Sequence, residues 1–406
     1  MTNPKLALIP SGYKGGTNPT VYSILPNDAT GDFDFDRASE GTRIRKDGLI
    51  EEVTNDVPRL DWLNSNCPSL LLEPQRTNLQ AYSENFSGLA WTPALVTITA
   101  NSNISPNGEL TAYKIESDQT NFTAELRGFL QINANTEYTY SLYVKAGTTS
   151  VCRIDLTDTL SGGASYYYGR VTFDMATETL TTDLATASFD KLDGGWYRLK
   201  ITATSPNPLQ GATRSSIILP EVGSIFIWGA QMEAGGYATS YIKNVDDANG
   251  VTRLKDEVFA EDSNLFNITE GTLFVDATPF KSGGGMEIQL SDGTANNRHT
   301  IQYQGTGTSV RALTVRGGTI VFSDYNPLTF DQRNKLAITF KKDEFKFYVN
   351  GSLVHTDTSG DVPTGLDKLT FSNPNLTGTF MEGKIHDIRV YDKVLTQTEA
   401  IQLTTI

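Results

Sequence analysis

Histidine and cysteine are scarce in this chain of 406 residues. The three histidines, His299, His355 and His386, have no second ligand at metal-binding spacing, and the sequence therefore predicts no zinc site. The two cysteines, Cys67 and Cys152, lack the clustered spacing of a disulfide framework. We expect both cysteines to be reduced and mostly buried.

Basic residues and long apolar runs are also few. Lysine and arginine total 33 against 47 acidic residues, so the formal net charge is −14 and nucleic acid would be repelled. No run of about 18 apolar residues occurs. The first residues lack the charged stretch, apolar core and cleavage site of a signal peptide. We expect no nucleic-acid partner, no membrane insertion and folding in the cytoplasm.

Motifs of catalytic sites are missing as well. The chain has no Gly-x-Ser-x-Gly elbow for a serine nucleophile, and Gly283-Gly-Gly285 lacks the following Lys-Ser/Thr pair of a phosphate-binding loop. Residues 269–406 contain no strand of the Glu-x-Asp-x-Glu or Glu-x-Asp-x-x-Glu type that lectin-fold glucanases use, and Asp387 stands alone. We expect a non-catalytic protein that needs no cofactor.

Residues that favour strands and turns are abundant. The chain has 35 Gly and 17 Tyr, is rich in Thr and Asn, and shows helical periodicity only in short windows, which predicts an all-β fold. Its length allows two or three domains, each with its own core. The polar composition is typical of proteins that act outside cells.

The first two predicted segments are an arm and a sandwich. Residues 1–78 carry short apolar pieces between turn signals, which predicts an irregular N-terminal docking arm that orders through contacts outside itself. Within it, the pair Asp47-Gly48 predicts a hairpin turn. Residues 79–243 contain regularly spaced strands, which predicts a jelly-roll or related antiparallel sandwich. One strand, 137–145, alternates polar residues with side chains expected to face the core, namely Tyr138, Tyr140, Leu142 and Val144.

The C-terminal part is predicted to form a second sandwich. Residues 244–268 combine turn residues with a charged stretch and are interpreted as a linker. Residues 269–406 then contain several apolar strands, such as 334–340, 345–350 and 383–391. Thr396, followed by Glu399, predicts a capping box that opens one short C-terminal helix.

Some stretches are unusual enough to indicate a family. They are Leu6-Ala-Leu-Ile-Pro-Ser-Gly-Tyr13, Arg37-Ala-Ser39 with Thr42-Arg43, Gly48-Leu-Ile-Glu51, Pro58-Arg-Leu-Asp61, Cys67-Pro-Ser-Leu-Leu-Leu-Glu-Pro-Gln-Arg-Thr-Asn-Leu79 and Trp228-Gly-Ala-Gln-Met-Glu-Ala-Gly-Gly-Tyr-Ala-Thr-Ser-Tyr-Ile242. These stretches resemble a modular family of tailed-bacteriophage virion structural proteins of the tail-fibre or head-fibre type. The last stretch looks like the closing strands of that family's carbohydrate-binding-module-like jelly roll.

The C-terminal strands at 335–350 and 383–391 are similar to concanavalin A-like or laminin-G-like lectin domains. That resemblance implies two curved antiparallel sheets packed face to face, with a rim or concave surface that often meets sugar. The same fold also serves as a spacer or an interaction module.

The two resemblances together imply a function. The chain is expected to be a non-catalytic virion structural protein, made in the host cytoplasm, that projects from the particle and acts as a receptor-binding or tail-fibre-type adhesin for host surface glycans. A head decoration or head-fibre protein is the alternative, and a glycan depolymerase is a third reading. The expected partners are other virion proteins, bound through the arm, and host or environmental glycans. A homo-oligomer such as a trimer is expected.

Two segments have the residue types that bind sugar, which are aromatic rings for the apolar face and planar polar groups for the hydroxyls. In Ser165-Tyr-Tyr-Tyr168 at least one tyrosine must face outward if the segment is a strand, and Tyr166 and Tyr168 are the candidates. Packing against neighbouring strands or another subunit is the alternative. The loop 291–298 offers the second set, which an ordinary polar turn would also explain: Asp292, Asn296, Asn297 and Arg298.

A cation site is the last candidate. Asp32, Asp34 and Asp36 alternate with phenylalanines, which puts three carboxylates on one face of a strand. Calcium or a cationic partner would suit such a row. Calcium, however, needs six or more oxygens that converge from a loop, so a solvated strand face is the simpler interpretation.

Overall fold

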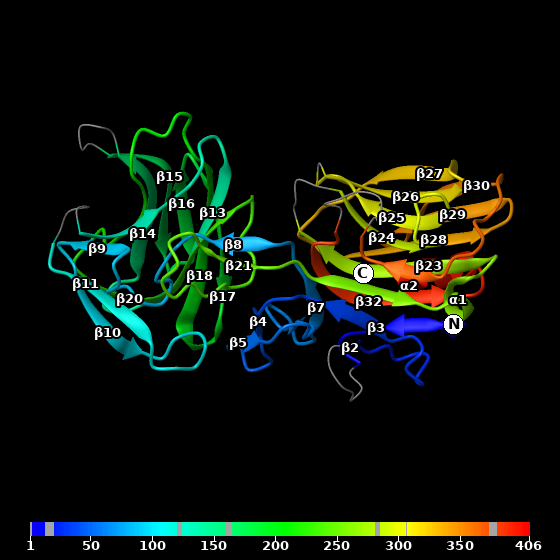
Figure 1. Cartoon of the computed structure of the whole chain (residues 1–406), viewed down its shortest axis with the longest axis horizontal. Helices are drawn as coiled ribbons and strands as arrows, with labels where there is room; N and C mark the ends of the chain where they lie inside the picture. The colour runs from blue at the N-terminus through cyan, green and yellow to red at the C-terminus, as the bar shows by residue number, and fades with distance from the viewer. Residues whose placement is uncertain are drawn as a thin grey trace.

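The computed structural model of the protein describes residues 2–12, 20–119, 124–159, 165–280, 285–305, 307–372 and 380–406. Two antiparallel sandwiches lie side by side, joined by a few short strands between them (Figure 1). The predicted all-β fold class with two sandwiches is confirmed. Tyr13, Gly283 and Gly284, which the sequence analysis mentions, lie outside the described residues.

The first sandwich consists of two six-stranded sheets. The β15 sheet has the order β16-β15-β14-β19-β12-β9, and the β18 sheet has the order β10-β11-β20-β13-β18-β17. The strands are β9 (Trp91–Ala94), β10 (Thr97–Asn103), β11 (Ala112–Ser117), β12 (Glu125–Leu130), β13 (Glu137–Ala146), β14 (Val151–Thr159), β15 (Ser165–Asp174), β16 (Thr179–Asp183), β17 (Thr186–Lys191), β18 (Trp196–Thr204), β19 (Thr213–Ile218) and β20 (Gly223–Ala234), with one 3-10 turn at Asp193–Gly195.

Alternating side chains build the core of the first sandwich. Tyr138, Tyr140, Leu142 and Val144 of β13 are all buried in it, as the pattern of this strand predicted. Their partners on β18 belong to the same core, because cross-strand neighbours in an antiparallel pair point to the same side.

The second sandwich consists of two eight-stranded sheets. The β28 sheet has the order β30-β29-β28-β23-β32-β7-β6, with β1 also paired to β32, and the β25 sheet has the order β2-β3-β22-β31-β24-β25-β26-β27. The C-terminal strands are β22 (Glu257–Glu261), β23 (Gly271–Pro279), β24 (Met286–Ser291), β25 (Arg298–Tyr303), β26 (Ser309–Arg316), β27 (Thr319–Pro327), β28 (Asn334–Lys341), β29 (Glu344–Val349), β30 (Ser352–Asp357), β31 (Lys368–Thr370) and β32 (Gly383–Tyr391).

The N-terminal segment supplies the remaining strands of this sandwich, so the contacts outside itself that were expected for the docking arm of residues 1–78 are made with the rest of the same chain. These strands are β1 (Leu6–Leu8), β2 (Thr20–Val21), β3 (Phe33–Asp36), β6 (Leu60–Asp61) and β7 (Ser69–Leu72). Leu6, Leu8, Phe33 and Phe35 are buried in the core of the second sandwich. The apolar pieces are too short to form a core alone, and they complete one that is built mostly from residues after position 257. The N-terminus accordingly lies beside this sandwich in Figure 1.

Residues 244–268, interpreted from the sequence as a linker, also carry strands. Strand β21 (Val251–Arg253) pairs with β8 (Arg76–Asn78), and β22 continues into the second sandwich by pairing with β3 and β31. The segment contains the turn residues that suggested a linker. Its charged residues, however, lie in the strands β21 and β22 or between the two sandwiches. The hairpin β4 (Gly41–Ile44) to β5 (Ile50–Val53) lies at the same junction, and its turn residue Gly48 has a φ of 76°, as the Asp-Gly pair predicted.

Two short helices complete the structure. Helix α1 (Ser263–Phe266) is a single turn, and α2 (Gln397–Thr404) begins with the predicted capping box of Thr396 and Glu399. Within the described part of the chain, no helix has the length and apolarity needed to span a bilayer. Cys152 is buried, and Cys67 is exposed, which corrects the expectation that both cysteines would be mostly buried.

A buried cluster of five charged residues lies at the junction between the sandwiches. Arg59 Nη1 is 2.6 Å from Glu73 Oε2 and also pairs with Asp256, while Arg37 Nη1 is 3.2 Å from Asp256 Oδ1. Arg253 Nη2 lies 3.4 Å from the same Glu73 oxygen. All five side chains are almost completely buried. The two neighbouring basic groups, Arg59 and Arg253, together with hydrogen bonds, lower the pKa of Glu73 to about 2 despite its burial.

Phe35→Ala should destabilise the second sandwich by about 3–5 kcal/mol, because it removes a fully buried ring from the shared core. Asp34→Ala, which changes the exposed neighbour on the same strand, is the control and should stay within about 0.5 kcal/mol of the parent. Urea unfolding of the full chain measures both variants. Equal losses would show that β3 does not contribute to the folded core.

Glu73→Gln should lower stability by about 3–5 kcal/mol at pH 7, because three guanidinium groups would then face one carboxylate. The pKa of Glu73 is depressed in the folded state, so its contribution is present above the usual pKa of 4.5 and is lost as the pH falls toward 2. The gap between parent and variant in urea melts should therefore shrink below pH 4.5. Glu51→Gln, which alters a surface pair with Arg43, is the control, and a gap that is constant with pH would contradict the charge assignment.

Candidate functional site

The tyrosine triplet at the start of β15 does not point where the sequence suggested. Thr157 of β14 faces Tyr167, and the next residue, Leu156, faces Gly169, so that Tyr168 is an extra residue in a β-bulge. The bulge turns Tyr168 into the core, where it is 6% exposed. Tyr168 therefore cannot contact a glycan at the surface. Tyr166 is half-buried, and its hydroxyl lies 3.3 Å from Asp158 Oδ2.

Tyr167 is the tyrosine that faces outward, and it belongs to a row of side chains across the β15 sheet. The register places Phe129, Arg214, Thr157 and Tyr167 opposite one another on neighbouring strands. The adjacent row is Arg127, Ser216, Asp155, Arg170 and Asp183. We call these two rows together the Tyr167 face.

One end of the Tyr167 face is a rigid stack of an arginine on a tyrosine. The guanidinium of Arg170 lies 3.6 Å from the centre of the Tyr167 ring. Its Nε and Nη2 donate to the two carboxylate oxygens of Asp155 at 2.8 and 2.7 Å. The Tyr167 hydroxyl donates to Asp183 Oδ2 at 2.6 Å, and this hydrogen bond is the first cause of the raised pKa of Tyr167. Ring and guanidinium are therefore held in place before any ligand arrives.

The other end of the face is more open. The Phe129 ring is 40% exposed, and the guanidinium of Arg214 lies 5.2 Å from its centre. An exposed aromatic ring can stack on the apolar side of a pyranose, while neighbouring guanidinium and carboxylate groups can hydrogen-bond its hydroxyls. The Tyr167 face combines both kinds of group on one sheet.

The side chains of Asp292, Asn297 and Arg298 in the predicted loop 291–298 are hydrogen-bonded or paired within the protein, whereas Asn296 is exposed and is bonded through its backbone. Asp292 accepts hydrogen bonds from Thr294 and from Asn297 Nδ2, and Asn297 Oδ1 accepts from the Gly317 backbone. The Arg298 side chain is mostly buried and pairs with Glu287 at 3.2 Å. The backbone of Asn296 bonds to Thr294 and Gly318. These contacts are those of a polar turn, as the simpler interpretation expected.

The three aspartates of the proposed cation site do not converge. Asp34 and Asp36 are exposed on β3, while Asp32 precedes the strand and accepts hydrogen bonds from Ser23. Burial and the nearby carboxylates Asp56, Glu257 and Asp34 raise the pKa of Asp36. Among the residues that the structure describes, no group of three or more His, Cys, Asp or Glu could hold a metal ion. The row fits a solvated strand face better than calcium.

The histidines have structural surroundings. His299 is stacked on Phe340 at 3.7 Å, its Nδ1 lies 2.9 Å from Thr314 Oγ1, and burial lowers its pKa to about 3. Burial is also the main cause of the low pKa of His386, about 4. His355 lies 3.4 Å from Asp324.

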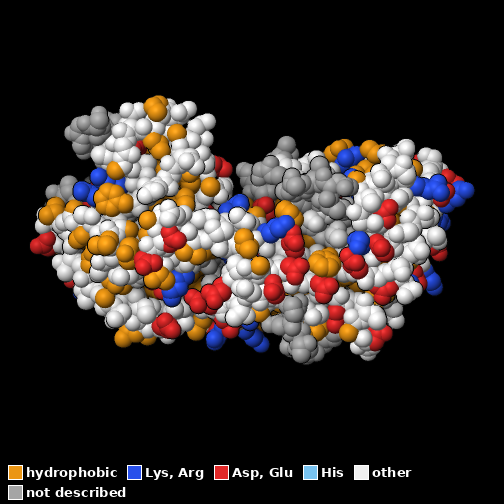
Figure 2. Space-filling model, in the orientation of Figure 1, with side chains coloured by type: hydrophobic (Ala, Val, Ile, Leu, Met, Phe, Trp, Pro, Cys, Tyr) orange, Lys and Arg blue, Asp and Glu red, His pale blue; other side chains and the backbone are white. Residues whose placement is uncertain are grey.

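On the face shown in Figure 2, acidic side chains are spread over both sandwiches and are frequent where the two meet, in keeping with the net charge of −14.

Residues 260–400 match the family model of the concanavalin A-like lectin/glucanases superfamily. The match covers the C-terminal strands of the second sandwich and leaves out the N-terminal strands that complete it. No curated protein matches the chain.

Solved structures with partial similarity include the following three proteins. A CBM40 domain of the Ruminococcus gnavus IT-sialidase, bound to α2,3-sialyllactose, is 18% identical, with 36% of this chain and 86% of that chain covered and a TM-score of 0.32. Domain 4 of the arabinanase AbnA from Geobacillus stearothermophilus, in complex with arabinotriose, is 16% identical over 42% and 82%, with a TM-score of 0.30. A heptameric SAP-like pentraxin from Limulus polyphemus is 13% identical over 33% and 69%, with a TM-score of 0.27.

Tyr168→Ala should destabilise the first sandwich by about 3–5 kcal/mol, because Tyr168 fills the core. Tyr167→Ala should cost about 1 kcal/mol or less, because it removes only surface contacts with Arg170 and Asp183. Chemical denaturation of both full-length variants gives the comparison. A larger loss for Tyr167→Ala would mean that the bulge is placed one residue away.

Proposed function

We propose that this protein is a non-catalytic structural protein of a tailed-bacteriophage particle and binds host surface glycans through the Tyr167 face. The observation that carries the glycan-binding part is the paired stacking of Arg170 on Tyr167 and Arg214 on Phe129, on one exposed sheet face. Arg170 and Tyr167 are fixed by Asp155 and Asp183, so little conformational entropy is lost at this end of the face when a sugar binds.

The proposal of a virion context is supported by the sequence stretches between Leu6 and Leu79 that resemble phage structural proteins. The lectin-superfamily match of residues 260–400 agrees with a role in sugar recognition by the second sandwich as well. A receptor-binding or tail-fibre role accounts for both features. A head decoration or head-fibre protein would share the fold and differ in its place on the particle.

A single face of this kind is shallow, and one sugar contact would be weak. Many copies on one particle raise the effective concentration of sites without any new contact, so useful adhesion would come from an oligomer or from the whole particle. The virion proteins that hold the chain must then contact surfaces other than β1, β3 and β7, because those strands pair within the second sandwich.

A double variant, Phe129→Ala with Tyr167→Ala, should reduce binding of the full-length protein to host surface glycans by at least about tenfold, since it removes both rings from the face. The matched control is Tyr325→Ala, because Tyr325 is also exposed, stacks with Arg311 at 5.0 Å and lies on the second sandwich. Binding is measured on an array of glycans from the host surface, and adsorption is measured with particles that carry each variant.

Loss of binding in the Tyr325→Ala control alone would place the glycan site on the second sandwich. Particles that lack the protein and still adsorb and infect normally would contradict adhesion and favour a decorative role on the head. Release of sugar products from host polysaccharide by the purified protein would contradict the non-catalytic assignment.

A further inference from the structure

A cavity of about 580 Å³ lies where the two sandwiches and the N-terminal hairpin meet. One wall is the outer side of the β18 sheet, which faces away from the Tyr167 face. The opposite wall comes from Thr42 to Glu73 and from the second sandwich, including Phe280 and Lys384. The volume falls in the range of small-ligand sites, about 300–1,000 Å³.

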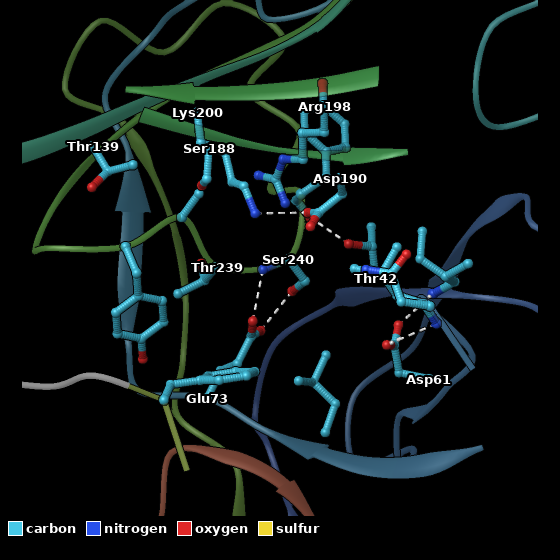
Figure 3. A pocket seen from close by; sticks show the side chains of 18 of the residues that line it. Thr42, Asp61, Glu73, Thr139, Ser188, Asp190, Arg198, Lys200, Thr239 and Ser240 are labelled. Carbon is cyan, nitrogen blue, oxygen red and sulfur yellow. Dashed lines mark hydrogen bonds and ion pairs between the residues drawn. The ribbon is translucent and has the colours of Figure 1, made fainter. Parts of the chain in front are cut away.

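Arg198 on the β18 wall has unused hydrogen-bonding capacity (Figure 3). Its side chain is 7% exposed, and its one hydrogen bond to a described residue runs from Nη2 to Ser141 Oγ at 2.9 Å. Its Nε is buried without a partner. The guanidinium lies 5.3 Å from the centre of the Tyr143 ring, which holds it from one side. A guanidinium has five N–H donors, so most of them remain available.

Among the described residues, no neighbouring carboxylate forms an ion pair with Arg198. The buried carboxylate of Glu233 attracts it from beyond ion-pair distance and is itself hydrogen-bonded to Thr239. Asp190 is its cross-strand partner on β17, but the Asp190 carboxylate pairs with Lys200 Nζ at 2.9 Å. Asp61 pairs with Lys384 at 2.9 Å across the cavity. Figure 3 shows Arg198, Lys200 and Asp190 grouped on one wall, so two cations there share one carboxylate.

Glu73 does not supply the missing charge. It forms hydrogen bonds with Ser240 N and Oγ, both at 2.7 Å, and is the carboxylate that Arg59 and Arg253 share. Among the described residues, Arg198 therefore has no carboxylate within ion-pair distance. Leaving a buried cation unpaired is costly, and an anionic ligand would remove that cost.

The rest of the cavity lining suits a sugar ring. Tyr237 follows β20 of the first sandwich, Phe280 follows β23 of the second, and their rings lie 5.5 Å apart at an interplanar angle of 57°. Both rings are partly exposed in the cavity wall. Hydroxyl groups line the space between the charged and the aromatic ends: Thr42, Thr139, Ser188, Thr239, Ser240 and Thr278.

We propose that this cavity binds an acidic sugar, with the carboxylate on the guanidinium of Arg198 and the ring between the hydroxyl groups and the Tyr237–Phe280 pair. A planar guanidinium matches a carboxylate geometrically, and the hydroxyls and aromatic rings distinguish a sugar acid from a simple anion. The site is separate from the Tyr167 face, so it goes beyond the proposed function and does not depend on it. Because the lining comes from both sandwiches, the ligand contacts both at once.

The test uses the full-length protein and D-glucuronate, with D-glucose and inorganic phosphate as the neutral and the non-sugar probes. Titration calorimetry should show saturable binding of glucuronate and at least about tenfold weaker binding of both other probes. Arg198→Gln should weaken glucuronate binding by about tenfold to a hundredfold, since a hydrogen-bonded charge pair is lost. Phosphate binding equal to that of glucuronate would overturn the assignment to a sugar acid.

Ser188→Trp provides a second variant, because Ser188 is exposed at the cavity and a bulky side chain there blocks the space while Arg198 stays in place. It should abolish glucuronate binding with no change in the unfolding midpoint. Arg311→Gln, on the second sandwich, is the control and should keep full glucuronate affinity. Unchanged binding in both Ser188→Trp and a folded Arg198→Gln would overturn the proposal and leave the Tyr167 face untouched.

Discussion

The buried cluster of Arg37, Arg59, Glu73, Arg253 and Asp256 is the constraint on which the arrangement of the two sandwiches depends. Each charge has left water at a cost of several kcal/mol, and only complete pairing offsets that cost. Arg37 also bonds to the backbone of three residues between 39 and 57, whereas the Nε atoms of Arg59 and Arg253 have no partner among the described residues. The five residues come from distant parts of the chain, so these parts must come together before the cluster can form.

The sequence stretches that resemble phage structural proteins coincide with this cluster. Arg37, Arg59 and Glu73 lie in three of those stretches, and Ser240 in a fourth bonds directly to Glu73. Asn78, in the stretch that ends at Leu79, donates to the backbone of Ala230 and Ile242. The motifs that resemble phage proteins therefore lie at the junction between the sandwiches. They indicate how the junction is built, and they carry less information about what the outer surfaces bind.

Strands with a regular pattern could be predicted from the sequence, and long-range pairing could not. The alternation around Tyr138 and Val144 determines which face is buried because the period of a strand is two. The sequence of Leu6–Leu8 does not indicate which strand it pairs with, because its partner β32 lies near the other end of the chain. The bulge at Tyr168 could not be predicted either, because one extra residue in the strand changes which side of the sheet each tyrosine faces. The one available signal was the following Gly169, since glycine is common at bulges. The alternation of its strand predicts that Arg198 faces solvent. The sequence does not show that another part of the chain covers this side and forms the opposite wall of the cavity.

The position of the cavity follows from the same constraint. The cluster fixes Glu73 and, through it, Ser240, and both residues line the cavity opposite Arg198. A hinge between freely jointed sandwiches would let such a cavity close or fill with water as the domains moved, and the unpaired cation would be relieved by solvent. Because the cluster holds the walls at a set separation, the Arg198 guanidinium stays mostly buried with few partners. The charge cluster, joined to the first sandwich through the hydrogen bonds between Glu73 and Ser240, thus also helps to preserve a site whose own charge has no ion-pair partner within the described protein.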